Sequence, residues 1–174
     1  GVAGLTAGAL SMAVGEYVSV STQRDSEEAM LAKERYELEH QPEHELEELV
    51  SLYRAKGLKE ETARTVAEEL TLHDAFAAHA DAELKTDPNN LTDPWHAAVA
   101  SAFAFTSGGI IPLIAITIPS PSRVALTFAS VVLALVVTGV LSAKLGGAGK
   151  RRATFRVVTG GVLAMAITYS VGAL

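Results

Sequence analysis

The charged residues of this chain are segregated, and the long segments without any charge are what most limits its fold. No Asp, Glu, Lys or Arg occurs in residues 94–122, 124–143 or 157–174. Each run reaches the roughly 17–25 residues that an α-helix needs to cross the hydrocarbon core of a bilayer. Helices of a soluble core usually keep a polar stripe, which these runs lack. The pattern therefore predicts an all-α, polytopic helical membrane protein.

The acidic residues form a segment of the opposite kind. Nineteen of the twenty lie between Asp25 and Asp93, and residues 24–93 carry a net charge of −11, whereas the rest of the chain carries +5. A block this acidic disfavours nucleic acid as a partner and favours cations. We expect residues 24–94 to form a soluble helical domain with a linker, inserted between membrane segments.

The first segment, residues 1–23, is apolar except for Glu16 and rich in small residues. Gly4 and Gly8 have the small-xxx-small spacing that lets membrane helices approach closely. We expect a further membrane span here, with a buried soluble helix as the alternative. The segment lacks the basic start of a signal peptide. Because the pattern of apolar and small residues is already present at Gly1, we expect other residues to precede Gly1.

Within the acidic block, the spacing of apolar residues predicts three or four short amphipathic helices. Pro42 suits the first position of one helix, and Gly57 suits the position just after its end. A further helix is expected over residues 59–70, and Thr71 is placed to cap another over 72–84. The residues expected to face a small core are Leu46, Leu49, Val50, Tyr53, Ala63, Val66, Ala67 and Leu70. So small a block is expected to dock on the membrane part or on a second copy.

The membrane spans after the linker are expected at residues 95–118, 124–143 and 154–174. The connection over 144–156 holds five basic residues, so the positive-inside rule places it in the cytoplasm. If residues 1–23 also span, the acidic block faces the cytoplasm too.

Glu16 is the first candidate functional residue, because a carboxylate among membrane-spanning residues is costly and usually functional. Met12 lies one helical turn earlier, so its thioether shares a face with the carboxylate. Such a pair suits the passage of a borderline divalent metal such as Fe²⁺. The alternatives are that Glu16 reaches the membrane interface and that Met12 only fills space.

Two pairs of glutamates with i,i+3 spacing lie on either side of Pro42. If the two helices fold against each other, four carboxylates converge and suit a divalent cation. A histidine and a glutamate with i,i+4 spacing follow later and add a nitrogen and an oxygen donor. The candidate metal ligands are Glu34, Glu37, Glu45, Glu48, His79 and Glu83. The other glutamates of the block are expected to be solvated surface.

Several kinds of chemistry are disfavoured. The chain has no cysteine, so disulfides and thiolate metal sites are excluded. Glu37 and His40 match half of a ferritin-like di-iron motif, but no second copy exists and Pro42 cuts the helix. Phosphate loops and catalytic triads are absent. We expect no enzymatic activity and no permanently bound cofactor.

One feature inside a predicted span has two interpretations. Gly108 and Gly109 precede Pro112. They indicate either close packing with a kink or a broken helix that exposes carbonyl oxygens to a passing ion.

The stretches AGALSMAVGEYVSVSTQRDSE, ERYELEHQPEHELEELVSLYRAKGL and SAFAFTSGGIIPL resemble the vacuolar iron transporter family of Fe²⁺ and Mn²⁺ transporters. The resemblance covers essentially the whole chain. It implies a homodimer with five spans per chain, a cytoplasmic metal-binding domain between spans two and three, and exchange of metal for protons. The spans visible here would be the second to the fifth, so the first span and its aspartate would be missing.

The resemblance also implies roles for particular residues. Met12 and Glu16 match the Met/Glu pair on the family's translocation path. Glu34, Glu37, Glu45 and Glu48 match carboxylates of its metal-binding domain. In the third helix Glu83 matches a Met-Met-x-x-Glu pattern whose methionines are absent here, and His79 would stand in for them.

Together these features predict an integral membrane transporter that exports Fe²⁺, with Mn²⁺ as a second cargo, from the cytoplasm in exchange for protons. The membrane would be a bacterial-type cytoplasmic membrane, or a vacuolar membrane in a eukaryote. The alternative is a membrane-anchored metal-binding or sensing protein that transports nothing.

Overall fold

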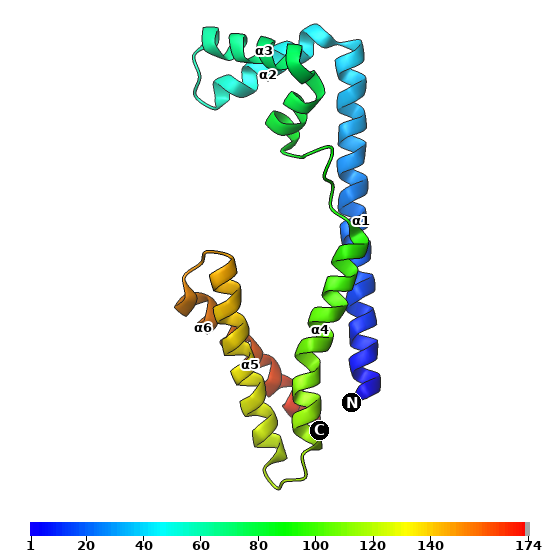
Figure 1. Cartoon of the computed structure of the whole chain (residues 1–174), viewed down its shortest axis with the longest axis vertical. Coiled ribbons are helices and arrows are strands. Elements are labelled where there is room, and N and C mark those ends of the chain that lie inside the picture. Colours follow the sequence, from blue (N-terminus) through cyan, green and yellow to red (C-terminus); the bar gives the residue numbers. More distant parts are fainter. Residues whose placement is uncertain (173–174) are drawn as a thin grey trace. The chain divides into compact units, whose positions relative to one another are not determined.

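The computed structural model describes residues 1–172. Its elements are α1 (Val2–His40), α2 (Pro42–Ala55), α3 (Glu60–His79), the π-helical turn η1 (Ala80–Leu84), α4 (Pro94–Thr117), α5 (Arg123–Leu145) and α6 (Lys150–Gly172) (Figure 1). No strand occurs in the described part of the chain, which confirms the all-α prediction.

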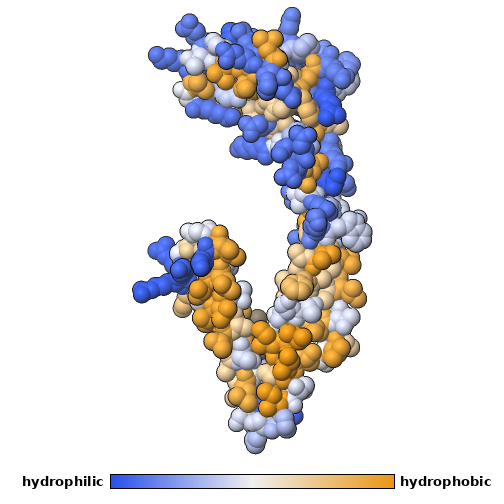
Figure 2. Space-filling view, in the orientation of Figure 1, coloured by the Kyte–Doolittle hydropathy of each residue, from blue (hydrophilic) through white to orange (hydrophobic). Residues whose placement is uncertain are grey.

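The chain divides into two compact units. The apolar unit consists of Gly1–Ala13 and Val99–Leu174, and the acidic unit consists of Val14–Ala98. Figure 2 shows mostly hydrophilic side chains on the acidic unit and mostly hydrophobic ones on the helices of the apolar unit. Each unit is described by itself below.

Three helices, α4, α5 and α6, are long and apolar enough to cross a membrane. Their bounds agree with the predicted spans to within a few residues, and the predicted end of the last span lies outside the described residues. The N-terminal part of α1 is not among the three, because Glu16 and the small and polar residues around it lower its mean hydropathy. A span over residues 1–23 stays a prediction.

Small residues bring the helices of the apolar unit close together. A Cβ on Gly109 would lie 2.5 Å from Leu5 Cδ1, and one on Gly139 would lie 2.7 Å from the backbone of Thr154. α4 continues without interruption through Gly109 and Pro112. Of the two interpretations of this stretch, the structure therefore favours close packing over a broken helix.

The acidic unit has a small core of apolar residues from α2, α3 and η1. Its buried members are Leu49, Val50, Ala63, Ala67 and Ala82, with Leu46, Leu52, Tyr53, Leu58 and Ala78 packed against them. α2 begins at Pro42, and Gly57 follows its end with a φ of +101°, a left-handed conformation that favours glycine. Both predicted boundaries of this helix are confirmed.

One local expectation was wrong, and it concerns Thr71. α1 runs unbroken from Val2 to His40, since the change from apolar to charged residues introduces no helix breaker. Thr71 does not cap a separate helix. Instead α3 is kinked at Asp74, which has extended backbone angles, and the Ala77 N–H donates to Asp74 Oδ1 at 2.9 Å. An Asp is a stronger N-cap than a Thr, so the cap forms three residues later.

Candidate metal site

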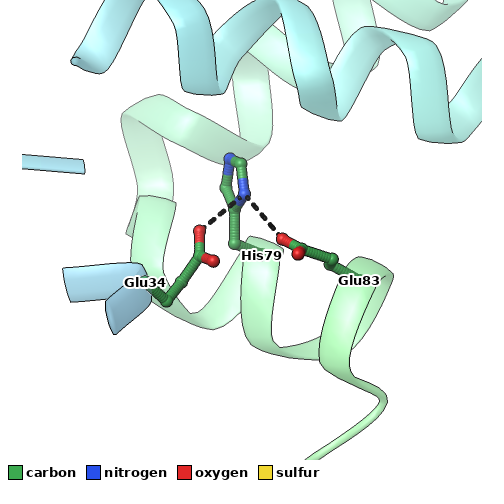
Figure 3. Close-up of side chains that lie close together, drawn as sticks. All are labelled: Glu34, His79 and Glu83. Atoms are coloured by element: carbon green, nitrogen blue, oxygen red, sulfur yellow. Dashed lines mark ion pairs between the residues drawn. The ribbon is translucent and has the colours of Figure 1, made fainter. Parts of the chain in front are cut away.

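Four titratable side chains from three helices and the π-helical turn meet inside the acidic unit. Glu34 comes from α1, Glu45 from α2, His79 from the end of α3 and Glu83 from η1. The Nδ1 atom of His79 lies 2.9 Å from Glu34 Oε1, 3.7 Å from Glu45 Oε2 and 3.9 Å from Glu83 Oε2. Figure 3 shows the carboxylates of Glu34 and Glu83 reaching toward the imidazole. One imidazole therefore stands among three carboxylates.

The local folding of each helix explains why these side chains point inward. Glu45 precedes Leu49 by four residues on α2, so it shares the face that packs on the core. Gln41 separates α1 from α2, and Glu34 on the first helix and Glu45 on the second both lie near His79. His79 is the last residue of α3, in the part of the helix that follows the kink at Asp74.

The π-helical turn positions the last carboxylate. In η1 the N–H of Lys85 donates to the carbonyl of Ala80, five residues earlier, which widens the helix directly after His79. Glu83 lies in this turn. Lys85 then ends it with a φ of +53°, a left-handed conformation that is uncommon for a residue other than glycine. Single π-turns inside or at the end of helices often occur at functional sites.

These groups are buried without the partners that burial normally requires. Glu34 and Glu45 are each 3% exposed and His79 is 1% exposed. Within residues 1–172, Glu34 Oε1, Glu83 Oε2 and both ring nitrogens of His79 have no hydrogen-bond partner. The His79 and Glu34 atoms are near enough but not aligned for a hydrogen bond. An unsatisfied buried polar group costs about 1–3 kcal/mol, so the cluster calls for a ligand.

The charges in the cluster are also unbalanced. Burial, together with the negative charges of Glu83, Glu45 and Glu37, raises the pKa of Glu34 to about 7. Carboxylates that share a buried site cannot all ionise without a compensating positive charge. A divalent cation would supply that charge.

The donors define the kind of cation. Carboxylate oxygens and one imidazole nitrogen suit borderline first-row divalent ions such as Fe²⁺, Mn²⁺ and Zn²⁺. Glu34, His79 and Glu83 each offer one donor atom, and these atoms lie within 4.8 Å of one another. The arrangement can hold a metal ion.

A second group of possible ligands lies on α2. It consists of His44, Glu45 and Glu48. His44 is largely exposed, and its Nδ1 atom lies 3.4 Å from Glu45 Oε1. Glu45 thus faces His79 with one oxygen and His44 with the other. Sequence reasoning missed His44, although its i,i+4 spacing to Glu48 was a usable signal.

The remaining candidates lie elsewhere. Glu37 pairs with Lys33 at 2.7 Å instead of joining the cluster. His40 is exposed, and its Nδ1 atom lies 2.7 Å from the backbone oxygen of Tyr36, away from the cluster.

The two candidates for a translocation path both lie on α1. Met12 is 48% exposed, and Glu16 is also exposed. Among the described residues Glu16 has no ion pair or side-chain hydrogen bond. Next to Glu16, the ring of Tyr17 lies 4.8 Å from that of Trp95. Aromatic residues of this kind gather at membrane–water interfaces.

Comparison with known proteins gives a consistent result. The model of the VIT family matches residues 1–173. The chain is 47% identical over 99% of its length to a protein of Acanthamoeba castellanii named "Vacuolar iron transporter", of which it covers 67%. It is 37% identical to "Vacuolar iron transporter homolog 1" of Oryza sativa subsp. japonica, over 98% of this chain and 56% of that protein. It is 34% identical to "Vacuolar iron transporter homolog 2.1" of Arabidopsis thaliana, over 97% of this chain and 62% of that protein. The chain thus spans about two thirds or less of the length of these relatives.

Proposed function

This chain belongs to the VIT family, and from that premise we propose that the protein transports Fe²⁺ out of the cytoplasm in exchange for protons. It is a membrane protein, with three helices able to span the bilayer. Mn²⁺ is a second candidate cargo, because the same donors suit both ions.

The buried cluster of Glu34, Glu45, His79 and Glu83 is the observation that carries the proposal. Its unpartnered polar atoms and its excess of carboxylates make it a capture site for a divalent cation. The net charge of −11 over residues 24–93 would raise the cation concentration around it. Residues 24–94 would lie in the cytoplasm and take up the metal there.

Met12 and Glu16 would pass the metal along the membrane. Their exposure on α1 leaves both side chains open to an ion or to a second protomer, in keeping with a homodimer. Protonation of Glu16 after the metal leaves would couple the two fluxes, because a carboxylate binds either a proton or a cation.

The test is uptake of Fe²⁺ by proteoliposomes that hold the full-length protein and a pH-sensitive dye. Glu16→Gln should abolish the coupled movement of metal and protons. Glu39→Gln, which removes an exposed carboxylate from the same helix, should leave it unchanged. Unaltered flux in Glu16→Gln would refute the proposed coupling.

The second candidate function is a membrane-anchored metal-binding or sensing protein. The burial of the cluster favours it, since a site with few exposed atoms can bind a cation without releasing it across a membrane. Metal binding at Glu34 and His79 with no flux in any liposome condition would select this function over transport.

A further inference from the structure

Basic residues gather at one end of the apolar unit, where α5 connects to α6. Lys144 lies in the last turn of α5 and is followed by a short glycine-rich turn. Four more basic residues lie in the first two turns of α6: Lys150, Arg151, Arg152 and Arg156. All five are exposed. Figure 2 shows hydrophilic side chains gathered at this end of the helix pair, directly beside apolar surface.

The unit offers these cations no internal partner. Neither Gly1–Ala13 nor Val99–Leu174 contains an Asp or a Glu. Across residues 1–172, none of the five basic side chains forms an ion pair. Their charge must therefore be balanced from outside the unit.

The position of the cations at α6 strengthens this requirement. The first turn of α6 contains no acidic residue and holds Lys150, Arg151 and Arg152. The positive end of the helix dipole lies in that turn and disfavours cations there. The same dipole and the free backbone N–H groups favour an anion. An anion bound at this end would relieve both effects.

A hollow beside these residues indicates what carries the anion. It has a volume of about 450 Å³ and is lined by Val140, Lys150, Arg151, Thr154, Phe155 and Val158. The Oγ1 atom of Thr154 is buried beside Gly139 and has no hydrogen-bond partner among the described residues. Phe155 is 74% exposed. A free phosphate ion would use the basic side chains but would leave the apolar lining without a partner.

We propose that the α5–α6 end binds an anionic phospholipid. The headgroup phosphate lies against Lys150, Arg151 and the first turn of α6. An acyl chain lies along Val140, Phe155 and Val158. Clusters of this kind next to a membrane span attract anionic lipid headgroups. The inference does not depend on the proposed transport function, because it concerns residues that have no part in the metal site.

The test is native mass spectrometry of the full-length protein in detergent, titrated with dioleoylphosphatidylglycerol or with dioleoylphosphatidylcholine. The unaltered protein should bind phosphatidylglycerol more tightly than phosphatidylcholine. The double variant Lys150→Gln/Arg151→Gln should lose roughly 25-fold in affinity for phosphatidylglycerol, since each basic residue near an anionic lipid contributes about fivefold. Lys56→Gln/Lys59→Gln, an equal charge change in the acidic unit, should have no effect.

Two further measurements keep the outcome decisive. Arg151→Lys should retain most of the affinity, which separates lost charge from damaged folding. Phe155→Ser should weaken binding of the lipid but not of soluble glycerol phosphate. Equal affinity for the two lipids, or an unchanged Lys150→Gln/Arg151→Gln variant, would overturn the proposal. Displacement of the lipid by millimolar inorganic phosphate would also overturn it, in favour of a site for free phosphate.

Discussion

The Nδ1 atom of His79 lies 2.9 Å from Oε1 of Glu34, and neither atom has a hydrogen-bond partner in the described part of the chain. The two residues come from α1 and α3, so the contact joins distant parts of the sequence. Such a pair gains little from its own attraction, because taking charged or polar groups out of water costs several kcal/mol. A cation bound between His79 and Glu34 would supply the favourable interaction that the two side chains lack.

Replacing His79 with Leu should separate metal binding from stability. The change removes the nitrogen donor and also removes two buried, unpartnered polar atoms. Metal affinity should fall by at least about 10–100-fold, the loss seen when even the outer shell of a metal site is damaged. The metal-free protein should be equally stable or more stable. Isothermal titration with Mn²⁺ and thermal unfolding measure the two effects, and His73→Leu on the exposed side of α3 is the control.

The raised pKa of Glu34 predicts how the stability of the metal-free protein depends on pH. The pKa is about 7 in the folded protein against 4.5 for an unperturbed glutamate. Between about pH 4.5 and pH 7, Glu34 therefore holds a proton in the folded state that it has lost in the unfolded state. This contribution to stability is complete below about pH 4.5 and disappears as the pH rises to about 7. Thermal unfolding without metal should show this decline, and Glu34→Gln should remove it.

Metal binding should show the linked effect. A cation must displace the proton that Glu34 holds at neutral or lower pH, so binding releases protons and the affinity rises with pH. Titration in two buffers that differ in ionisation enthalpy measures the number of protons released. If wild-type protein and Glu34→Gln release the same number, Glu34 is not part of the site.

Substitutions of Asp74 and Thr71, near the kink in α3, should have different effects on stability. Asp74→Ala removes the N-cap bond to Ala77 and should cost about 1 kcal/mol of stability. It should also lower metal affinity, because the helical segment that it caps carries His79. Thr71→Val should be neutral or stabilising, since the Thr71 hydroxyl is buried without a partner among the described residues. Chemical denaturation of both variants measures their free energies of unfolding. If Thr71→Val is less stable than Asp74→Ala, Thr71 caps the helix instead.

Close contact between α5 and α6 predicts a steric effect at Gly139. A Cβ there would lie 2.7 Å from the backbone of Thr154, so Gly139→Val should push the helices apart. Overpacking of this kind typically costs about 1–3 kcal/mol. Gly160→Val is the matched control on α6, because open space surrounds the added group. Thermal stability in detergent compares the two.

Local patterns in the sequence were sufficient for much of this structure. Pro42 and Gly57 bound α2 because each restricts or frees its own backbone. The i,i+4 spacing of His79 and Glu83 placed both in the buried cluster. Glu37, which has the same spacing to Glu34 as Glu48 has to Glu45, instead pairs with Lys33. Only the packing of three helices decides which member of such a pair points inward.

Other features depended on competition that a linear pattern does not reveal. Thr71 and Asp74 were both able to cap a helix, and the stronger acceptor prevailed. The π-helical turn at Ala80–Leu84 has no residue signature of its own, although it places Ala82 in the core. The unbroken α1 shows that helical backbone hydrogen bonds continue across the change from apolar to charged side chains.

Glu45 presents one oxygen to His79 and the other to His44. A carboxylate carries a single negative charge, so cations at the two groups would draw on the same charge. A cation in the buried group would then lower the affinity of the exposed group for a second cation. A cation in the exposed group would lower the affinity of the buried group in the same way. The domain would fill in two steps of unequal affinity, and the second ion to arrive would be the first to leave.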